Sequence, residues 1–220
     1  TLIGSWQNYQ HFDGINKSDL QSMTDKIIHR GPDGEGHYIN SNIGLGHRRL
    51  AILDLSEAGH QPMIDEEFVL TYNGEIYNYL EIKEELKKLG HIFKTDSDTE
   101  VIIYAYKEWS TDCVLKFNGM WAFALFDKTK KELFVSRDRF GIKPFYYLNH
   151  EKGFYFGSEI KQLIHFLPEI KVNRRVLFDF LYFSYQHHTN ETFFKGIVSM
   201  PAGHNLIYNL NNNTFTITQY

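Results

Sequence analysis

The chain has very little cysteine, because Cys113 is the only one in its sequence. A single thiol excludes an intrachain disulfide framework, and we expect the protein to work in a reducing cytoplasm. Cys113 stands near apolar Val114 and Phe117, and no neighbouring feature would lower its pKa. A buried, inert thiol is therefore favoured over a nucleophile at this position.

Long apolar runs and an excess of positive charge are missing as well. No run approaches the roughly 20 apolar residues of a membrane span, and we expect no signal peptide before the domain. The formal net charge is −4, so neither nucleic acid nor a membrane is an expected partner. The 11 histidines include no H-x-x-x-H pair, His187 and His188 are interpreted as a loop pair, and no metal site is predicted.

Glycines cluster in HRGPDGEGHY, residues 29–38, without the features of a phosphate-binding loop. They do not open a helix after a strand, and no Lys-Ser/Thr pair follows them. No linker rich in proline, glycine or serine divides the 220 residues, and we predict a single domain, 1–220.

The pattern of apolar residues predicts few helices and many strands. The expected helices are 17–30, 80–89, 98–109, 158–166 and 173–183. The expected strands are 1–6, 42–55, 68–72, 120–127, 132–138, 144–149, 153–158, 204–210 and 214–219. Short polar turns join two of the strand pairs, which makes them antiparallel. Helices in blocks between groups of strands indicate an α+β fold.

The segment VLTYNGEIYNY, residues 69–79, carries an Asn-Gly pair, Asn73 and Gly74, after a strand-like run. A two-residue hairpin should return as a second alternating strand, but residues 80–89 have helical spacing and are followed by Gly90. This order predicts a backbone amide and a carboxamide exposed at a strand end, where a ligand could bind. An ordinary connector that uses glycine for backbone freedom is the alternative.

Two charged residues stand in places that invite explanation. Arg49 falls in the apolar run 42–55, where a guanidinium needs an anionic partner or a ligand carboxylate. Arg48 is expected to face the opposite side, and a structural salt bridge is the alternative for Arg49. Asp98 is placed as the N-cap of helix 98–109, which accounts for a carboxylate without function. Together with Asn73-Gly74 for an oxyanion, these charges would describe an amino-acid site with acyl-transfer chemistry.

Seven blocks of the sequence, in the same order, resemble the amino-terminal glutaminase domain of asparagine synthetases, which are class II glutamine amidotransferases with an N-terminal nucleophile. The blocks are HRGPDGEG, GHRRLAILDLSEAGHQPM, YNGEIYNY, TDSDTEVIIYAY, NGMWAFALFD, SRDRFGIKPFYY and FGSEIKQL. The resemblance runs over the whole chain. It implies a four-layer αββα sandwich with two antiparallel sheets, of the N-terminal-nucleophile hydrolase type, which agrees with the α+β prediction.

The resemblance also implies roles for individual residues. Arg49 would bind the α-carboxylate of glutamine, and the strand Leu50, Ala51, Ile52 and Leu53 would line the pocket. The Asn73 carboxamide and the Gly74 N–H would form the oxyanion hole, while Glu75 and Asp98 would hold the α-ammonium group. Losing one donor of this kind costs about 3 kcal/mol in catalysis.

The family's nucleophile is a cysteine at the start of the processed chain, whose own α-amine can act as base. This chain begins with Thr1. In one register Thr1 takes the cysteine position and its hydroxyl serves as nucleophile. In the other, a cysteine stands immediately before Thr1 and the opening reads C-T-L-I-G, which puts Gly4 where the family has its glycine. The second register needs no gap and is favoured.

The S-G-G-x-D-S nucleotide loop of the family's synthetase domain does not occur in the sequence. We therefore expect no cofactor in this domain, with ATP and magnesium belonging to the synthetase domain. The partners implied are glutamine and a C-terminal synthetase domain, and a homodimer is left open. A catalytically silent glutamine-binding or regulatory domain, or a structural partner-binding module, are the alternative functions.

Overall fold

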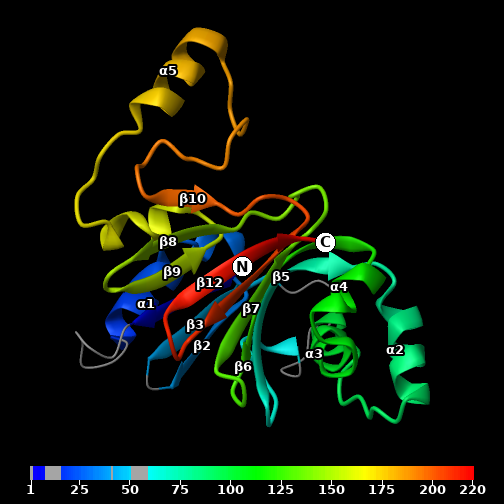
Figure 1. Cartoon of the computed structure of the whole chain (residues 1–220). Helices are drawn as coiled ribbons and strands as arrows, with labels where there is room; N and C mark the ends of the chain where they lie inside the picture. Colours follow the sequence, from blue (N-terminus) through cyan, green and yellow to red (C-terminus); the bar gives the residue numbers. More distant parts are fainter. Residues whose placement is uncertain (1, 8–15, 41, 51–58) are drawn as a thin grey trace.

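The computed structural model describes residues 2–7, 16–40, 42–50 and 59–220 of the chain (Figure 1). Two antiparallel sheets lie face to face and helices cover their outer faces. The four layers run helix, sheet, sheet, helix. The predicted αββα sandwich with two antiparallel sheets is therefore confirmed.

The first sheet has the strand order β10-β8-β9-β1-β3-β2. Its strands are β1 Leu2–Gln7, β2 Gly34–Asn40, β3 Ile43–Arg49, β8 Tyr146–His150, β9 Gly153–Gly157 and β10 Ile197–Ser199. Strand β1 pairs antiparallel with β3 on one side and β9 on the other. The amino-terminal strand is thus central in this sheet.

The second sheet has the order β12-β11-β7-β6-β5-β4. Its strands are β4 Met63–Ile64, β5 Phe68–Ile76, β6 Gly119–Asp127, β7 Glu132–Arg137, β11 His204–Asn209 and β12 Thr214–Gln219. Both hairpins expected from polar turns are present, β6–β7 here and β8–β9 in the first sheet. Strand β4 pairs with only two residues of β5, so within the described part of the chain much of that edge of β5 has no neighbouring strand.

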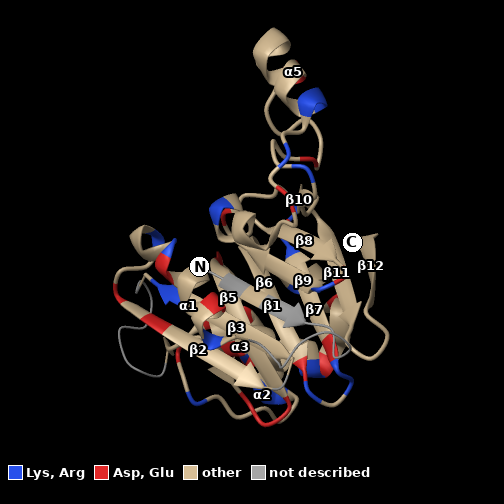
Figure 2. Ribbon diagram, turned by 90° about the vertical axis from the view of Figure 1, so that its left-hand side faces the viewer, with Lys and Arg blue, Asp and Glu red and all other residues tan. Residues whose placement is uncertain are grey.

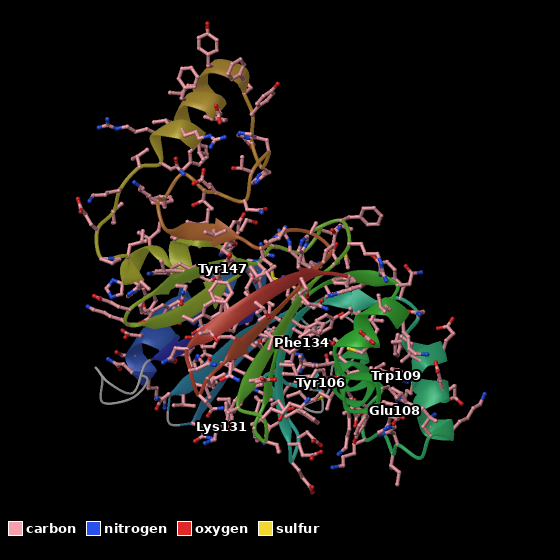
Figure 3. All side chains as sticks on the ribbon, viewed as in Figure 1. Tyr106, Glu108, Trp109, Lys131, Phe134 and Tyr147 are labelled. Carbon is pink, nitrogen blue, oxygen red and sulfur yellow. The ribbon has the colours of Figure 1, made fainter. Side chains whose placement is uncertain are left out.

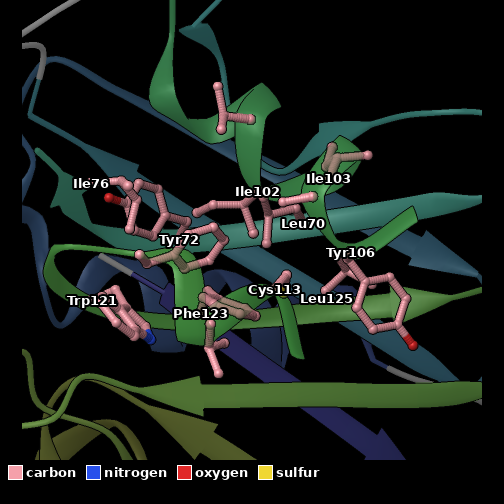
Figure 4. Packing of buried hydrophobic residues seen from close by; sticks show 14 of the residues in the cluster. Leu70, Tyr72, Ile76, Ile102, Ile103, Tyr106, Cys113, Trp121, Phe123 and Leu125 are labelled. Carbon is pink, nitrogen blue, oxygen red and sulfur yellow. The ribbon is translucent and has the colours of Figure 1, made fainter. Parts of the chain in front are cut away.

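Alternation along the strands builds one apolar core between the sheets and one beneath each helical layer. The inter-sheet core includes Leu45 and Phe156 from the first sheet and Val69 from the second. Figure 3 labels Tyr147, another of its members. Leu70 and its neighbours on the opposite face of the second sheet pack against α2 and α3 (Figure 4).

The helices begin where their sequences supply caps. Helix α1, Lys17–Asp25, follows Asn16, whose side chain accepts a hydrogen bond from the Ser18 N–H and so satisfies a free helix donor. It covers the first sheet together with the 3-10 turns Ile28–Arg30, Ile160–Gln162 and Ile164–Phe166. Helices α2 Tyr79–Lys88, α3 Asp98–Trp109 and α4 Cys113–Lys116 cover the second sheet. Gly90 has φ +98° just beyond α2, which confirms the expected glycine at that helix end.

Helix α5, Arg174–Phe183, stands away from the sandwich (Figures 1 and 3). Only Val176 of its ten residues is buried, while Leu181 and Tyr182 are 73% and 74% exposed. Its rings contact one another, as in the stacked pair Phe178–Tyr182 with centroids 5.4 Å apart. Acidic and basic residues are interspersed over the sandwich below it (Figure 2).

Several predicted elements were wrong in extent. The strand 42–55 ends at Arg49, Leu50 is outside any strand, and residues 51–55 lie outside the described part. The predicted helix 158–166 is instead two 3-10 turns, Ile160–Gln162 and Ile164–Phe166. The side chains of Glu159 and Gln162 form a capping box around the first turn, which closes it as a tight turn. Strand β2 was missed, since its glycines 34 and 36 weaken the strand pattern.

Candidate functional site

Strand β5 carries a row of backbone N–H groups on its open edge. The Tyr72 N–H donates to Gln61 Oε1 at 2.7 Å, and the Ile76 N–H donates to Asp98 Oδ2 at 3.0 Å. Alternate residues of a strand direct their N–H groups to the same side, so the Gly74 N–H, midway between them, points to this edge too. No group in the described part of the chain accepts a hydrogen bond from it. Gly74 therefore presents a free donor between two occupied ones.

The Asn73 carboxamide is a second free donor. Its Nδ2 is buried and has no hydrogen-bond partner in the described structure. Asn73 shares a face of β5 with Val69 of the inter-sheet core and with Thr71, whose Oγ1 donates to the Gly46 carbonyl at 3.2 Å. Buried polar groups without partners are rare in folded proteins. An orphan amide beside a free backbone N–H indicates a place for an oxygen atom of a ligand.

The expected location of the Asn-Gly pair at a strand end was wrong. Strand β5 continues to Ile76, and Asn73 and Gly74 lie opposite Ala122 and Trp121 of β6. The backbone stays extended because β6 pairs with it along its whole length. The Gly74 N–H is available because β4 pairs only with Val69 and Leu70 of β5, a feature set by the sheet order.

Gly74 is required here for close packing, since it has no positive φ in this structure. A Cβ atom on Gly74 would lie 2.2 Å from the Met120 carbonyl oxygen, 2.7 Å from Tyr72 Cε2 and 2.8 Å from Trp121 Cα. Two of these atoms belong to the backbone of β6 and cannot move aside cheaply. The absence of a side chain thus brings the strands together behind the free N–H.

Arg48 and Arg49 face opposite sides of β3, as predicted. Arg48 contacts Asp25 at 2.7 Å and Glu35 at 2.5 Å, on the side of α1. Ile43 and Leu45 lie in the inter-sheet core, and alternation puts Arg49 on their face, at the end of the row and toward β5. Arg48 thus forms ion pairs on the α1 side of β3, and Arg49 places a second guanidinium on the face shared with Asn73.

His47 joins β3 to β5 next to these residues. Its Nε2 lies 3.1 Å from the Tyr72 carbonyl oxygen, and because a carbonyl only accepts, this nitrogen carries the hydrogen. Burial lowers the pKa of His47 well below its ordinary value, so the ring is neutral at neutral pH. The contact fixes the spacing of the two strands that carry Arg49 and Asn73.

Asp98 differs from its predicted role as N-cap. Ser97 is the N-cap of α3 and accepts from the Thr99 N–H at 3.1 Å, while Asp98 is the first helical residue. The Asp98 side chain turns to β5, where its Oδ2 accepts from the Tyr72 hydroxyl at 2.7 Å and from the Ile76 N–H. Burial raises the pKa of Asp98, and these two hydrogen bonds oppose the increase. Its carboxylate is therefore anchored at the edge that exposes the Gly74 N–H.

The remaining site predictions divide between described and undescribed residues. Glu75 is half-buried and shares the face of Asn73, and its charge also raises the pKa of Asp98. Leu50 is 56% exposed and follows the end of β3. Thr1, Ala51, Ile52 and Leu53 lie outside the described residues. Tyr72, Gln61 and His47, which also contact this part of β5, were not predicted from the sequence. The sequence offered two indications of a role for these residues: Tyr72 directly precedes Asn73, and His47 and Gln61 lie in the resembling block GHRRLAILDLSEAGHQPM.

Cys113 and the histidine pair, also weighed from the sequence, lie outside this site. Cys113 is fully buried, and burial raises the pKa of its thiol, which confirms the prediction of an inert cysteine. His187 and His188 lie in a loop, with His188 Nε2 3.0 Å from Asp179. Over the described residues, no group of three or more potential metal ligands comes together. None of the described helices has both the length and the apolar character that a membrane crossing needs.

Taken together, β3, β5 and the first turn of α3 bring a cation, two free N–H donors and an anchored carboxylate to one edge of the sandwich. This set can bind a zwitterion and stabilise an oxyanion close to it. The comparisons with known proteins agree with that chemistry. Residues 3–220 match the sequence model of the glutamine amidotransferase domain.

Two curated relatives come from Bacillus subtilis. Asparagine synthetase [glutamine-hydrolyzing] 3 is 37% identical over 212 residues, which cover 94% of this chain and 34% of the relative. Asparagine synthetase [glutamine-hydrolyzing] 2 is 40% identical over 208 residues, which cover 91% of this chain and 27% of the relative. The chain thus spans about a third or less of these relatives.

Among solved structures, the glutamine phosphoribosylpyrophosphate amidotransferase from B. subtilis superposes with a TM-score of 0.69 at 18% identity. The match covers 99% of this chain and 48% of that one, and at this identity it supports the fold alone. The family match over nearly the whole length, together with the fold, is sufficient for assignment. The chain belongs to the glutamine amidotransferase domain family.

Proposed function

We propose that the chain hydrolyses glutamine to glutamate and ammonia at the open edge of β5. The observation that carries this proposal is the pair of free donors on adjacent residues, Asn73 Nδ2 and the Gly74 N–H. They are suited to an oxygen that gains negative charge during reaction. Arg49 on β3 and Asp98 on α3 supply the two charges that a free amino acid requires.

In the proposed complex, the side-chain carbonyl oxygen of glutamine accepts hydrogen bonds from Asn73 and Gly74. Arg49 binds the α-carboxylate, and Asp98 and Glu75 bind the α-ammonium group. A thiolate attacks the amide carbon and the oxygen becomes an oxyanion held by the two donors. The C–N bond then breaks, ammonia leaves with a proton, and water hydrolyses the γ-glutamyl thioester to glutamate and free thiol. One donor contributes a rate factor of about 10²–10³.

We propose that the thiolate comes from a cysteine immediately before Thr1. Strand pairing supports this register: Leu2 lies opposite His47 and Gly4 opposite Leu45. A Cβ atom on Gly4 would meet Phe156 and Leu45 of the inter-sheet core. Alternate residues of a strand share a face, so the position four residues before Gly4 lies on the same face as Gly4. This position is the one immediately before Thr1, and continuing the β1–β3 register places it opposite Arg49. A cysteine there would face the space that Arg49 and Asn73 also face.

The test compares two chains that differ by one residue. One begins at Thr1, and the other carries a cysteine before Thr1 that is exposed by removal of the initiator methionine. We expect rapid ammonia release from glutamine by the cysteine-bearing chain and a loss of at least about 10³-fold without it, since covalent catalysis is then absent. Robust hydrolysis by the chain beginning at Thr1, abolished by Thr1→Ala, would make Thr1 the nucleophile instead.

A catalytically silent glutamine-binding domain is the alternative function. It requires the same contacts to Arg49 and Asp98 but no nucleophile. Calorimetric binding of glutamine together with no hydrolysis by either chain would support it. Absence of glutamine binding by both chains would remove both proposals.

We propose that the ammonia is used by a synthetase domain that activates aspartate with ATP and magnesium. The longer B. subtilis relatives are named glutamine-hydrolyzing asparagine synthetases, which supports an ammonia-using synthetase partner. The chain itself should then need no cofactor. Helix α5, with its exposed apolar side chains, is a candidate surface for such a partner. A homodimer is the other assembly to test, by light scattering of the purified chain.

A further inference from the structure

Tyr72 links several residues at the candidate site. Its N–H donates to Gln61, its carbonyl accepts from His47, and its hydroxyl donates to Asp98 Oδ2 at 2.7 Å. Its Cε2 is 2.7 Å from where a Cβ on Gly74 would lie, so the ring packs directly behind the free N–H. The side chain is 3% exposed and lies beside Ile76 on the helical face of β5 (Figure 4).

The ring of Tyr72 is explained by packing, but its hydroxyl is not. Phenylalanine would fill the same place in the core between the second sheet and α3, where Phe123 and Phe134 already lie. A buried hydroxyl is tolerated only when it has a partner. Here the partner is a carboxylate rather than a backbone group, and that carboxylate is 5% exposed. The hydroxyl therefore has a specific consequence for Asp98.

The hydrogen bond restricts rotation of the Asp98 carboxylate. Oδ2 is held by the Tyr72 hydroxyl and the Ile76 N–H from two directions, so the carboxylate plane is fixed and Oδ1 stays outside both bonds. Without the hydroxyl, Oδ2 would lose one of its two donors and be held less firmly, so the carboxylate could turn more easily about its Cβ–Cγ bond. A turned carboxylate would bind an ammonium group less well, because charge-assisted hydrogen bonds depend on direction.

We propose that Tyr72 is a positioning residue whose hydroxyl aims the Asp98 carboxylate at the α-ammonium group of glutamine, an inference that rests on the proposed glutaminase function. The hydroxyl touches no substrate atom in this role. Its effect is confined to substrates that carry an α-ammonium group. Catalysis on the side-chain amide by Asn73 and Gly74 proceeds without it.

The experiment compares glutamine with glutaramate, its analogue without the α-amino group, in the cysteine-bearing chain. We expect Tyr72→Phe to lower kcat/KM for glutamine at least about tenfold, since a hydrogen bond to a charged group is lost, mainly through KM. We expect kcat/KM for glutaramate to stay within about twofold. Tyr106→Phe is the matched control, because Tyr106 is also buried in that core and its hydroxyl lies 3.4 Å from Lys130 instead of Asp98.

A second variant separates positioning from folding. When Tyr72→Phe is added to Asp98→Asn, the ratio of kcat/KM for glutamine to kcat/KM for glutaramate should stay the same as in Asp98→Asn alone, because the carboxylate that Tyr72 positions is already replaced. Equal losses on both substrates, or no loss on glutamine, would overturn the inference while leaving the glutaminase function intact. Failure of the parent to hydrolyse glutamine would overturn the proposed function, and the inference with it. Melting temperatures show whether Tyr72→Phe folds. If it does not fold, Asp98→Asn alone must lower kcat/KM for glutamine while leaving kcat/KM for glutaramate nearly unchanged.

Discussion

Replacing Asn73 with alanine should affect activity and stability in different directions. The Asn73 Nδ2 is buried without a partner among the described residues, and an unsatisfied buried donor costs about 1–3 kcal/mol. Alanine removes that cost, but it also removes the packing of a half-buried side chain. We expect the unfolding free energy of Asn73→Ala to equal that of the parent or to exceed it by up to about 2 kcal/mol. For a domain of this size, each 1 kcal/mol corresponds to a change of about 2–4 °C in melting temperature.

The same substitution should reduce catalysis strongly. The carboxamide is one of two donors proposed for the oxyanion, and removing such a donor costs about 3 kcal/mol, or a factor of about 10²–10³ in kcat. Ammonia release by the cysteine-bearing chain measures kcat, and thermal and denaturant unfolding measure stability. A large loss of activity in a protein at least as stable as its parent cannot be attributed to misfolding.

Asn205 offers a matched control for this experiment. It is buried on β11 and its Oδ1 also has no hydrogen-bond partner in the described structure, but β7 and β6 separate β11 from β5. Asn205→Ala should leave kcat within about twofold of the parent, as expected of a substitution outside the site. A kcat for Asn73→Ala within tenfold of the parent would refute the oxyanion role, and an equal loss in Asn205→Ala would show that the effect is not local.

Four further outcomes follow from the same geometry. Gly74→Ala should destabilise the fold by at least about 1–3 kcal/mol in denaturant unfolding, because its Cβ would lie 2.2 Å from the Met120 carbonyl oxygen; unchanged stability would contradict the close pairing. Arg49→Ala should weaken glutamine binding by about 2–3 kcal/mol in calorimetry while the melting temperature holds, and equal affinity would remove Arg49 from the site. Burial raises the pKa of Asp98 above 3.8, so the folded protein binds this proton more tightly than the unfolded chain, and its stability declines as the pH rises from the unfolded pKa through the folded pKa. The melting temperature of Asp98→Asn, measured relative to that of the parent, should therefore increase over this pH interval. A difference in melting temperature that does not change with pH would contradict the raised pKa. The chain should show no saturable magnesium-dependent ATP binding in a titration, because it has no phosphate-cradling loop.

The sequence alone determined most of the architecture. Alternating apolar residues and polar turns indicated the antiparallel hairpins β6–β7 and β8–β9, since period-two burial belongs to strands. The helical spacing of apolar residues indicated helix 173–183, which is α5 with Asn173 as its N-cap. The pattern failed in short, glycine-containing or tightly turned pieces such as β2 and the turns of residues 160–166, where local signals are weak and neighbouring strands or caps decide the conformation.

For the site, the sequence indicated the types of group but could not decide their arrangement. Arg49, Asn73, Gly74 and Asp98 were identified from charge placed in apolar runs, from the Asn-Gly pair and from the resemblance to a family. Only the tertiary structure made the Gly74 N–H available, because β4 pairs with Val69 and Leu70 alone, and it left the Asn73 carboxamide without a partner among the described residues. It also turned Asp98 from a helix cap into an anchored carboxylate, through a hydroxyl 26 residues earlier in the chain. Such contacts depend on which strand lies at an edge and which helix packs beside it, and no local pattern of residues encodes that choice.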